Sequence, residues 1–344
     1  MTGVFLDQPE LLAPIIQSGR SRAIAAGVDA NEYDAICAQL SSASDWPAGF
    51  RAAGAAHRSQ AEAAEQANHR VTAGEAFLAA AACSHIATTV PSTDRPGHRE
   101  AADAMRHALT LLEPAAKHLS GTDFRGVLIG QADTPHAPLV VIAPGLDSSQ
   151  VEFLANAAAL RRRGLATLTI DGPAQGELAP DTTIRADYEV VIGQALDAVL
   201  ATGLRPRAFG LMALSLGGFY GAISLAREPR LAAGVTVSGP SRLTWNQLPP
   251  ILQAILTIRA GSEPAAQAFT AQVDLDGIAQ TIKQPLLVVD GELDIIPGCV
   301  NGEPLATHAP HGEYLLVPGG DHLVGNARWQ WLPQAADFLT EHLI

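Results

Sequence analysis

Ser215 is the residue with the clearest capacity for nucleophilic chemistry, because it stands at a sharp change of pattern. The apolar run Phe209–Leu214 stops at this serine, and Gly217 and Gly218 follow directly behind it. This order predicts a strand, a tight turn and a helix, with one hydroxyl at the turn. Residues 213–217 read Ala-Leu-Ser-Leu-Gly, a variant of the Gly-x-Ser-x-Gly nucleophile elbow. Alanine replaces the first glycine and is still small enough for such a strained turn.

A serine hydroxyl attacks at neutral pH only if a base takes its proton, and a third group must orient that base. Asp294 follows the apolar run Leu286–Asp290, and His322 follows Tyr314–Val317 in a glycine-rich loop. The chain order Ser, Asp, His is the order used by α/β-hydrolases. The sequence therefore predicts a catalytic triad of Ser215, Asp294 and His322.

The acid of this triad has neighbours that could be mistaken for it. Asp290 and Glu292 lie close to Asp294, and the choice of Asp294 depends on its place in the turn after the strand. Asp321 is adjacent to His322, and we expect it to stabilise the loop. Without both partners, Ser215 would be readable as a small residue in an ordinary strand-to-helix turn.

An oxyanion hole requires two backbone N–H groups aimed at the charge that develops on the substrate. The residue after the nucleophile usually supplies one, and a loop after an earlier strand supplies the other. Leu216 is therefore the first predicted donor. Leu146, in the loop that follows the apolar run Leu139–Ala143, is the second. Asp147 or Ser148 in the same loop could also cap the next helix.

The elements that must position these residues alternate between strand and helix patterns after Gly121. Strand-like runs are separated by helical stretches of a length typical of parallel βαβ units. The expected strands are 127–129, 139–143, 165–170, 208–214, 232–237, 286–290 and 314–317, and the expected helices are 150–163, 187–200, 300–308 and 329–343. This order predicts an α/β fold with a mostly parallel, doubly wound sheet.

The remaining segments differ from that alternation. From Glu10 to about His118 the chain is alanine-rich with apolar residues at helical spacing, so we expect an all-helical domain over residues 1–120. Residues 121–344 would form the hydrolase core. Within it, a proline-containing stretch at about 240–283 interrupts the strand and helix order, and we expect a small lid above the strand ends.

Composition excludes several classes of partner. A net charge of −13 over 344 residues, with no basic block, argues against nucleic acid and anionic membranes. We expect a small-molecule substrate with little or no charge. The three cysteines are widely spaced, and the histidines of the helical stretch fall at irregular intervals, so neither a disulfide framework nor a metal site is predicted. No cofactor motif stands out. With no signal segment or membrane span, a cytoplasmic location is expected.

With these residues in view, the chain resembles the dihydroxypseudooxynicotine hydrolase-like family of α/β-hydrolases, which is also similar to fungal yellowish-green pigment hydrolases that shorten polyketides. The resemblance covers most of the chain. It rests on Pro144–Ser149, on the run Gly164–Glu177 with its Asp-Gly-Pro-x-Gln-Gly-Glu ending, and on the helical N-terminal domain. Generic hydrolases have a shorter Asp-x-x-Gly-x-Gly version of that ending.

The resemblance implies hydrolysis of carbon–carbon or ester-type bonds in bulky cyclic or polyketide-like molecules, at a site between core and helical domain. Ser215, Asp294 and His322 match the triad positions of the family. Some relatives carry a carboxylate where this sequence has Asn246 and Gln247. Trp245 beside them is a candidate substrate-binding residue, or equally a tryptophan packed between the domains. The resemblance also suggests a homodimer.

Three functions follow from these patterns. The first is hydrolysis of an ester or a β-dicarbonyl carbon–carbon bond through an acyl-enzyme on Ser215. The second keeps the triad for a lyase that eliminates acetate from an acetylated tetronate-type polyketide and leaves an exocyclic double bond. The third is a ligand-binding hydrolase fold without catalysis. The sequence does not fix the exact substrate.

Overall fold

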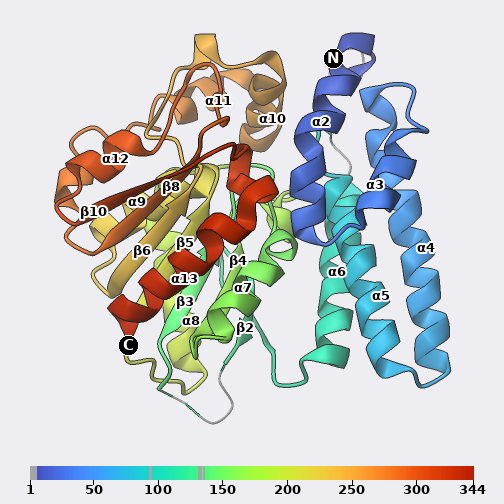
Figure 1. Ribbon diagram of the computed structural model, residues 1–344, viewed down its shortest axis with the longest axis horizontal. Helices are drawn as coiled ribbons and strands as arrows, with labels where there is room; N and C mark the ends of the chain where they lie inside the picture. The colour runs from blue at the N-terminus through green and yellow to red at the C-terminus, as the bar shows by residue number, and fades with distance from the viewer. Residues whose placement is uncertain (1–5, 93–94, 131–133, 135) are drawn as a thin grey trace.

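The computed structural model describes residues 6–92, 95–130, 134 and 136–344. Its N-terminal part is helical and lies beside the sheet, on the right in Figure 1. The elements of this helical region are α2 (Pro9–Ala26), α3 (Ala30–Cys37), η1 (Ala43–Asp45), α4 (Trp46–Gln66), α5 (Arg70–Ile86) and α6 (Arg95–Leu112).

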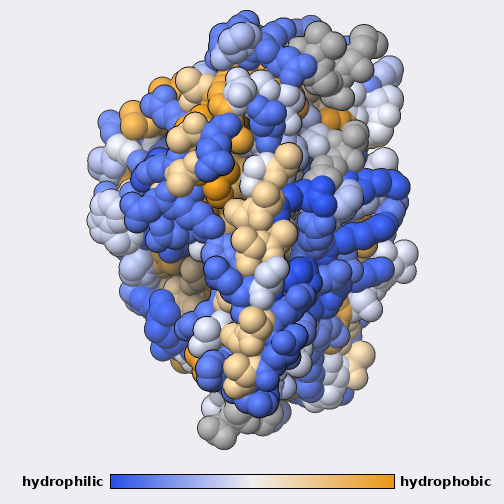
Figure 2. Space-filling view, turned by 90° about the vertical axis from the view of Figure 1, so that its right-hand side faces the viewer, coloured by the Kyte–Doolittle hydropathy of each residue, from blue (hydrophilic) through white to orange (hydrophobic). Residues whose placement is uncertain are grey.

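Small residues allow the long helices of this region to approach one another closely. A side chain at Gly54 of α4 would collide with Ser84 of α5, and one at Gly74 of α5 would collide with Leu112. Tyr33, Trp46 and Phe50 pack edge-on or tilted in the adjoining cluster. The outer surface is mainly hydrophilic and is crossed by a narrow, mildly hydrophobic band (Figure 2). Glycines at these helix contacts therefore allow the close packing.

The sheet has eight strands in the order β1-β2-β4-β3-β5-β6-β8-β10. β1 pairs antiparallel with β2, and β2 antiparallel with β4, whereas the other neighbours are parallel. The strands are β1 (Lys117–Ser120), β2 (Arg125–Ile129), β3 (Leu139–Ala143), β4 (Ala166–Asp171), β5 (Phe209–Leu214), β6 (Leu231–Val237), β8 (Leu286–Gly291) and β10 (Gly312–Val317).

Helices cover both faces of this sheet, so its central strands are buried throughout. One hydrophobic cluster joins the sheet to α8 (Tyr188–Ala201), α9 (Leu216–Arg227) and α12 (Glu303–His308). A second cluster joins the opposite face to α7 (Leu154–Arg161) and α13 (Arg328–Leu343). The near-continuous apolar strands seen in the sequence are those expected for a parallel sheet covered on both faces.

An insertion between β6 and β8 occupies the region predicted as a lid. It contains β7 (Arg242–Leu243), η4 (Trp245–Gln247), α10 (Pro250–Ala260), α11 (Glu263–Thr270) and η5 (Ala279–Thr281). β7 pairs with β9 (Cys299–Val300), which follows β8. Ile251 of α10 packs against the helical region, whereas Leu256 of the same helix packs into the core. The insertion therefore touches both parts of the molecule at the end where the parallel strands finish (Figure 1).

Two elements differ from the sequence prediction. The sheet begins at Lys117, inside the stretch expected to be helical. The sequence did not predict β1 because it is a mostly exposed edge strand without the apolar pattern of the others. The helix expected over 150–163 is split into η2 (Gln150–Phe153) and α7. Further short helical turns are η3 (Gly176–Leu178) and η6 (His322–Ala327). In the described part of the chain, every helix is too short or too polar to cross a membrane.

Candidate active site

The structure brings Ser215, His322 and Asp294 into one chain of hydrogen bonds. Ser215 Oγ lies 2.9 Å from His322 Nε2. His322 Nδ1 lies 2.9 Å from both Oδ1 and Oδ2 of Asp294. The three residues follow β5, β10 and β8 respectively, and the carboxyl ends of parallel strands meet at one edge of a sheet. With Nδ1–H donated to Asp294, Nε2 is left to accept the serine proton.

The backbone at Ser215 is strained in the way that a nucleophile elbow requires. Its φ of 57° and ψ of −134° lie outside the regions that most residues with a side chain adopt. A Cβ on Gly217 would lie 2.8 Å from the carbonyl oxygens of Ala143 and Pro144. Ala213 stands in the place of the first glycine, and a Cβ on Gly221 would lie 2.8 Å from its methyl group. The alanine therefore fits because the facing helix residue is a glycine.

The electrostatics of the site favour an oriented His322. Burial lowers the pKa of the imidazole, but the charge and hydrogen bond of Asp294 outweigh this effect and the net pKa is raised. For Asp294, burial acts to raise the pKa, and the neighbouring His322 outweighs it, so that the net pKa is lowered. The carboxyl side chain is 9% exposed and the imidazole 39% exposed. The acid is thus sheltered while the base remains accessible.

Ser238 supports both partners, and the sequence analysis did not identify it. Its hydroxyl accepts a hydrogen bond of 2.9 Å from the N–H of Leu323 and is also hydrogen-bonded to Asp294. It lies just after β6 with a φ of 52°, at the same sheet edge as the triad. A serine directly behind a strand of this sheet was the signal that could have drawn attention to it.

The backbone amides of Leu146 and Leu216 remain the candidate donors to an oxyanion. Among the described residues, neither the amide of Leu146 nor that of Leu216 donates a hydrogen bond to another backbone group outside its own helix. Leu216 is the first residue of α9, where amides have no partner within the helix. Gly145 is required here, because a Cβ on it would lie 2.7 Å from Ser215 Cβ and 3.0 Å from Oγ.

Gln175 holds the loop that carries Leu146. Its side-chain nitrogen donates to the carbonyl oxygens of Pro144 and Gly145, at 2.8 and 2.9 Å. Its side-chain oxygen accepts from the N–H of Gly172 at 2.8 Å and from the hydroxyl of Tyr188 at 2.7 Å. All four of its hydrogen-bonding positions are used. The motif that carried the family resemblance is thus a brace for the candidate oxyanion loop.

Asp171, at the start of the same motif, fixes the next part of that loop. It accepts hydrogen bonds from the backbone and side chain of Gln150, at 2.7 and 3.0 Å, and from the backbone of Glu177 at 3.1 Å. A Cβ on Gly176 would fall within 2.3 Å of the Asp171 carboxylate. The glycine is needed for this close approach.

The helical region contacts the site through α2. Arg22 forms ion pairs with Asp147 at 3.0 Å and with Glu152 at 2.7 Å. His85 Nε2 also lies within hydrogen-bonding distance of Glu152, at 3.0 Å. Burial raises the pKa of Glu152, but Arg22 and His85 bring it down to about 2. Ser21 of α2 also donates a hydrogen bond to Asp321, the residue before His322. Both the oxyanion loop and the histidine loop are therefore tied to the helical region.

The other acids near the site have different partners. Asp290 accepts a hydrogen bond of 2.8 Å from the N–H of Gly302 and one of 3.2 Å from the hydroxyl of Tyr314, and burial raises its pKa to about 6. Glu292 accepts from the N–H of Gly319 at 2.8 Å. Asp294 is the only one of the three acids that hydrogen-bonds His322 among the described residues.

Trp245 lies in η4 at the start of the insertion. It is half-buried and packs against the core cluster, and its carbonyl accepts a hydrogen bond of 2.8 Å from Gln253. Its neighbours Asn246 and Gln247 are exposed. A role in substrate binding stays a prediction.

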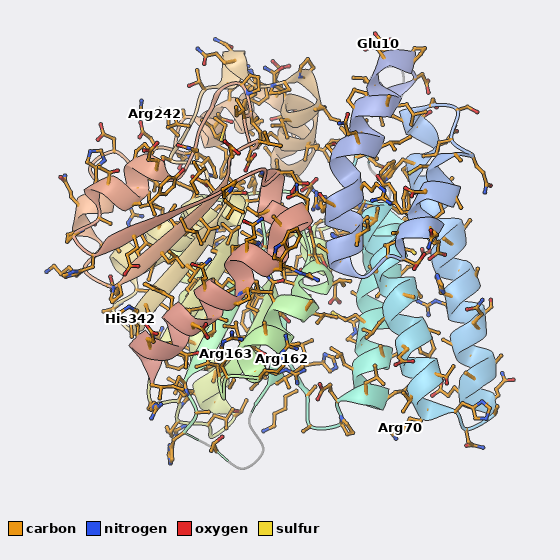
Figure 3. All side chains as sticks on the ribbon, in the orientation of Figure 1. Glu10, Arg70, Arg162, Arg163, Arg242 and His342 are labelled. Carbon is orange, nitrogen blue, oxygen red and sulfur yellow. The ribbon has the colours of Figure 1, made fainter. Side chains whose placement is uncertain are left out.

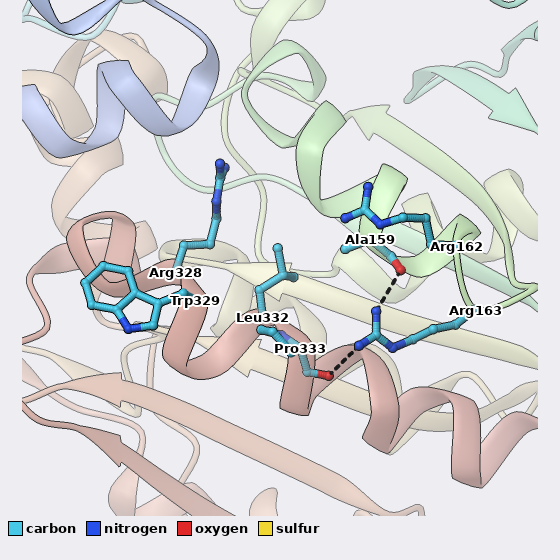
Figure 4. Close-up of a pocket in the computed structure, with 7 residues that line it drawn as sticks. All are labelled: Ala159, Arg162, Arg163, Arg328, Trp329, Leu332 and Pro333. Carbon is cyan, nitrogen blue, oxygen red and sulfur yellow. Dashed lines mark hydrogen bonds between the residues drawn. The ribbon is translucent and has the colours of Figure 1, made fainter.

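The larger of the two hollows described lies away from the triad, between α7 and α13. Arg162 and Arg163 stand together at the end of α7 (Figure 3). Arg163 is held there by the carbonyl oxygens of Ala159 and Pro333, at 3.2 and 3.4 Å (Figure 4). The hollow has a volume of about 240 Å³ and is lined by Ala159, Arg162, Arg163, Arg328, Trp329, Leu332 and Pro333. A smaller space of about 20 Å³ reaches Arg22, Leu214 and Leu323, next to the triad loops.

One group of side chains in the helical region could hold a metal ion. Ligand atoms of Glu32, His57 and Cys83 all lie within 4.8 Å of one another. His57 Nε2 is hydrogen-bonded to both carboxylate oxygens of Glu32, at 2.8 and 2.9 Å. Burial raises the pKa of the Cys83 thiol to about 12. The group is therefore a hydrogen-bonded histidine and glutamate beside a neutral buried thiol, and it lies on helices that the triad does not use.

Comparisons with known proteins agree with the resemblance seen in the sequence. No family model matches the chain. The chain is 28% identical over 314 residues to the 2,6-dihydropseudooxynicotine hydrolase of Paenarthrobacter nicotinovorans, which spans 84% of this chain and 82% of the relative. A crystal structure of 2,6-dihydroxy-pseudo-oxynicotine hydrolase superposes with a TM-score of 0.81 and 26% identity, covering 94% of this chain and 95% of the other. The structure of AbyA5 matches with a TM-score of 0.68 and 21% identity, covering 89% and 88%. The predicted α/β-hydrolase fold and the predicted likeness to dihydroxypseudooxynicotine hydrolases are confirmed.

Proposed function

We propose that this protein is a serine-dependent hydrolase that cleaves an ester or an activated carbon–carbon bond of a small molecule through an acyl-enzyme. The observation that carries the proposal is the unbroken series of hydrogen bonds from Asp294 through His322 to Ser215. Two unpaired amides beside the nucleophile and the likeness to a named hydrolase support it further.

The homodimer suggested by the resemblance is part of this proposal, and sedimentation at micromolar concentration tests it.

In the first step, Ser215 Oγ attacks a substrate carbonyl while His322 Nε2 takes the hydroxyl proton. The imidazolium that forms is stabilised by the carboxylate of Asp294, which is 2.9 Å from Nδ1. The charge on the former carbonyl oxygen is received by the amides of Leu216 and Leu146. Donors fixed before the reaction need little reorganisation when the charge develops, and the hydrogen bonds of Gln175 to the loop that carries Leu146 support this role.

In the second step, the tetrahedral intermediate collapses and His322 returns its proton to the leaving group. An alcohol can leave in this way. A carbon leaving group departs only as a stabilised enolate, so carbon–carbon cleavage requires a β-dicarbonyl substrate. Water activated by His322 then attacks the acyl-enzyme and restores Ser215. The bulky cyclic or polyketide-like substrate class is part of the same proposal, because it comes from the resemblance.

A covalent probe tests the nucleophile without knowledge of the substrate. A fluorophosphonate reacts with an activated serine, and the intact mass should rise by one phosphonyl group that peptide mapping places on Ser215. Ser215→Ala should give no adduct, whereas Ser59→Ala, which changes an exposed serine of α4, should react like the parent. An adduct that persists at the same rate in Ser215→Ala would contradict the proposal.

Turnover tests the reaction itself. With any ester or β-dicarbonyl substrate found in a screen, Ser215→Ala should lose at least about three orders of magnitude in kcat. In oxygen-18 water, hydrolysis places solvent oxygen in the released acid. Elimination of acetate places none there, so an unlabelled acid would favour the lyase reaction over the proposed one.

A further inference from the structure

Arg259 is a buried cation that forms no ion pair with any residue described in the structure. It lies in the last turn of α10, in the insertion, and is only 6% exposed. Among the described residues its guanidinium makes one hydrogen bond, from Nη1 to His98 Nε2 at 3.5 Å, and no ion pair. Burial lowers its pKa, and the charge of Arg22 adds to that effect while that of Asp147 opposes it.

Arg22 shows how this protein treats a sheltered guanidinium that serves structure. Its side chain is 16% exposed and is paired with Asp147 and Glu152 through five nitrogen–oxygen contacts of 2.7–3.3 Å. Arg259 is more deeply buried and has neither partner. Because charged side chains are rarely buried unless paired, the difference calls for a functional reason.

His98 of α6 does not neutralise this charge. It is itself buried, at 8% exposure, and burial together with the positive charge of Arg259 lowers its pKa to about 3. The imidazole is therefore neutral, hydrogen-bonds the backbone of Gly176 and leaves Nε2 to accept from the guanidinium. His98 can fix the direction of Arg259 while the positive charge remains available.

The position of Arg259 connects it to the candidate active site. Its carbonyl accepts a hydrogen bond of 2.9 Å from Ile184, which follows the motif that braces the oxyanion loop. Gly176, the partner of His98, donates a hydrogen bond of 3.2 Å to the carbonyl of Ser148 in that loop. Asp147 in the same loop exerts its charge on both Arg259 and His322. Arg259 is therefore linked through these hydrogen bonds to segments that adjoin the oxyanion loop, where helical region, core and insertion meet.

We propose that Arg259, oriented by His98, is the subsite that receives an anionic group of the substrate, a planar oxyanion in which two oxygens share the charge. A carboxylate and the enolate of a β-dicarbonyl both have this chemistry. The planar fork of a guanidinium matches two such oxygens, and the ligand supplies the counter-charge that the protein omits. The inference rests on the proposed function, because it places the charged end of the substrate relative to Ser215.

This subsite changes the substrate class expected from composition. The sequence predicted a ligand with little or no charge, because the chain is strongly acidic. A net negative charge repels an anion at long range, but a single buried cation acts at short range, where screening is weak. The two effects are compatible, and specificity is set by the buried contact.

The test measures binding of anions against neutral molecules of the same shape. The probes are cyclohexanecarboxylate with cyclohexanecarboxamide, and dimedone, a cyclic β-dicarbonyl that is anionic at pH 7.5, with its enol methyl ether. Binding is followed by calorimetry and by the rate of phosphonate labelling of Ser215, which a bound probe slows. The variants are Arg259→Gln and Arg259→Lys. Arg162→Gln, at an exposed position away from the triad, is the control because it removes the same charge.

We expect one of the two anions to bind the parent more tightly than its neutral partner. Whether this is the carboxylate or the enolate shows which of the two groups the subsite accepts. Arg259→Gln should weaken that anion about 10-fold to 100-fold and leave the neutral probes unchanged, with Arg259→Lys in between. Arg259→Gln should also raise the melting temperature without ligand, since it removes an unpaired buried charge. A purely structural arginine would lower it.

The subsite is refuted if neither anion binds the parent better than its neutral partner, or if Arg162→Gln loses as much affinity as Arg259→Gln. Binding is measured in Ser215→Ala as well. Anion binding that survives in Ser215→Ala supports the subsite even if the covalent mechanism fails. Phosphonate labelling without anion binding supports the mechanism and rejects the subsite.

Discussion

Replacing Gln175 with methionine tests whether the hydrogen bonds that brace the oxyanion loop control reactivity. Methionine has a similar length and fills the buried site, but it offers no amide to the carbonyl oxygens of Pro144 and Gly145. The substitution removes four hydrogen bonds of 2.7–2.9 Å. At about 1 kcal/mol each, the free energy of unfolding should fall by about 4 kcal/mol.

The effect on reactivity is separate from this loss of stability. Without the brace, the Leu146 amide is no longer held toward the nucleophile, while Leu216 stays fixed at the start of α9. Loss of one oxyanion donor typically reduces the rate by about 10²- to 10³-fold. The phosphonyl oxygen of a fluorophosphonate occupies the same position, so the labelling rate of Ser215 should fall by that factor. The assay is the second-order labelling rate, with circular dichroism to show that the variant is folded.

Tyr188→Phe is the matched control. It removes one of the hydrogen bonds to Gln175, and about 1 kcal/mol of stability, but leaves both bonds to the loop carbonyls intact. Its labelling rate should stay within about threefold of the parent, a difference of less than 1 kcal/mol. The reasoning is refuted if folded Gln175→Met labels at the parental rate, or if Tyr188→Phe slows labelling equally.

Three further predictions follow from the site. Asp294→Asn should reduce kcat about 10⁴-fold. Asp294 raises the pKa of His322 above the ordinary 6.5, and only the neutral imidazole accepts a proton, so the rising limb of the profile of kcat against pH should move to lower pH in the variant. A limb that does not move contradicts the assigned acid. Gly145→Ala should abolish phosphonate labelling and also lower the stability, since its Cβ would lie 2.7 Å from Ser215 Cβ and 3.0 Å from the Leu214 carbonyl oxygen; labelling at the parental rate would place the loop elsewhere. Arg22→Gln removes the guanidinium from the buried carboxylate of Glu152 and leaves it only the contact with His85, so unfolding in urea at pH 7 should show a loss of about 3–5 kcal/mol. Because the pKa of folded Glu152 is about 2, its contribution to the stability of the parent is present above pH 4.5 and is lost as the pH falls from 4.5 toward 2. The stability of the variant should no longer depend on pH in this range. An unchanged stability profile in acid would show that the pair does not stabilise the fold.

Local patterns in the sequence were sufficient for the fold and for the members of the triad. A parallel sheet covered on both faces produces continuous apolar strands, and residues that follow these strands meet at one edge, so the contact of Ser215 and Asp294 with His322 could be predicted from the sequence. The edge strand β1 was missed because it is exposed and has no such pattern. The short strands β7 and β9 lie in loops and carry no pattern of their own.

The tertiary structure alone decided which polar side chains meet across the boundaries between these segments. Ser238 beside Asp294, Arg22 on the oxyanion loop and Arg259 against His98 join residues that are far apart in the sequence. A charged residue looks the same in a sequence whether it is paired, exposed or buried alone, because its environment is formed by other parts of the chain. Whether a cation is balanced by the protein or left for a ligand is therefore a property of packing, and packing between distant segments carries no local periodicity.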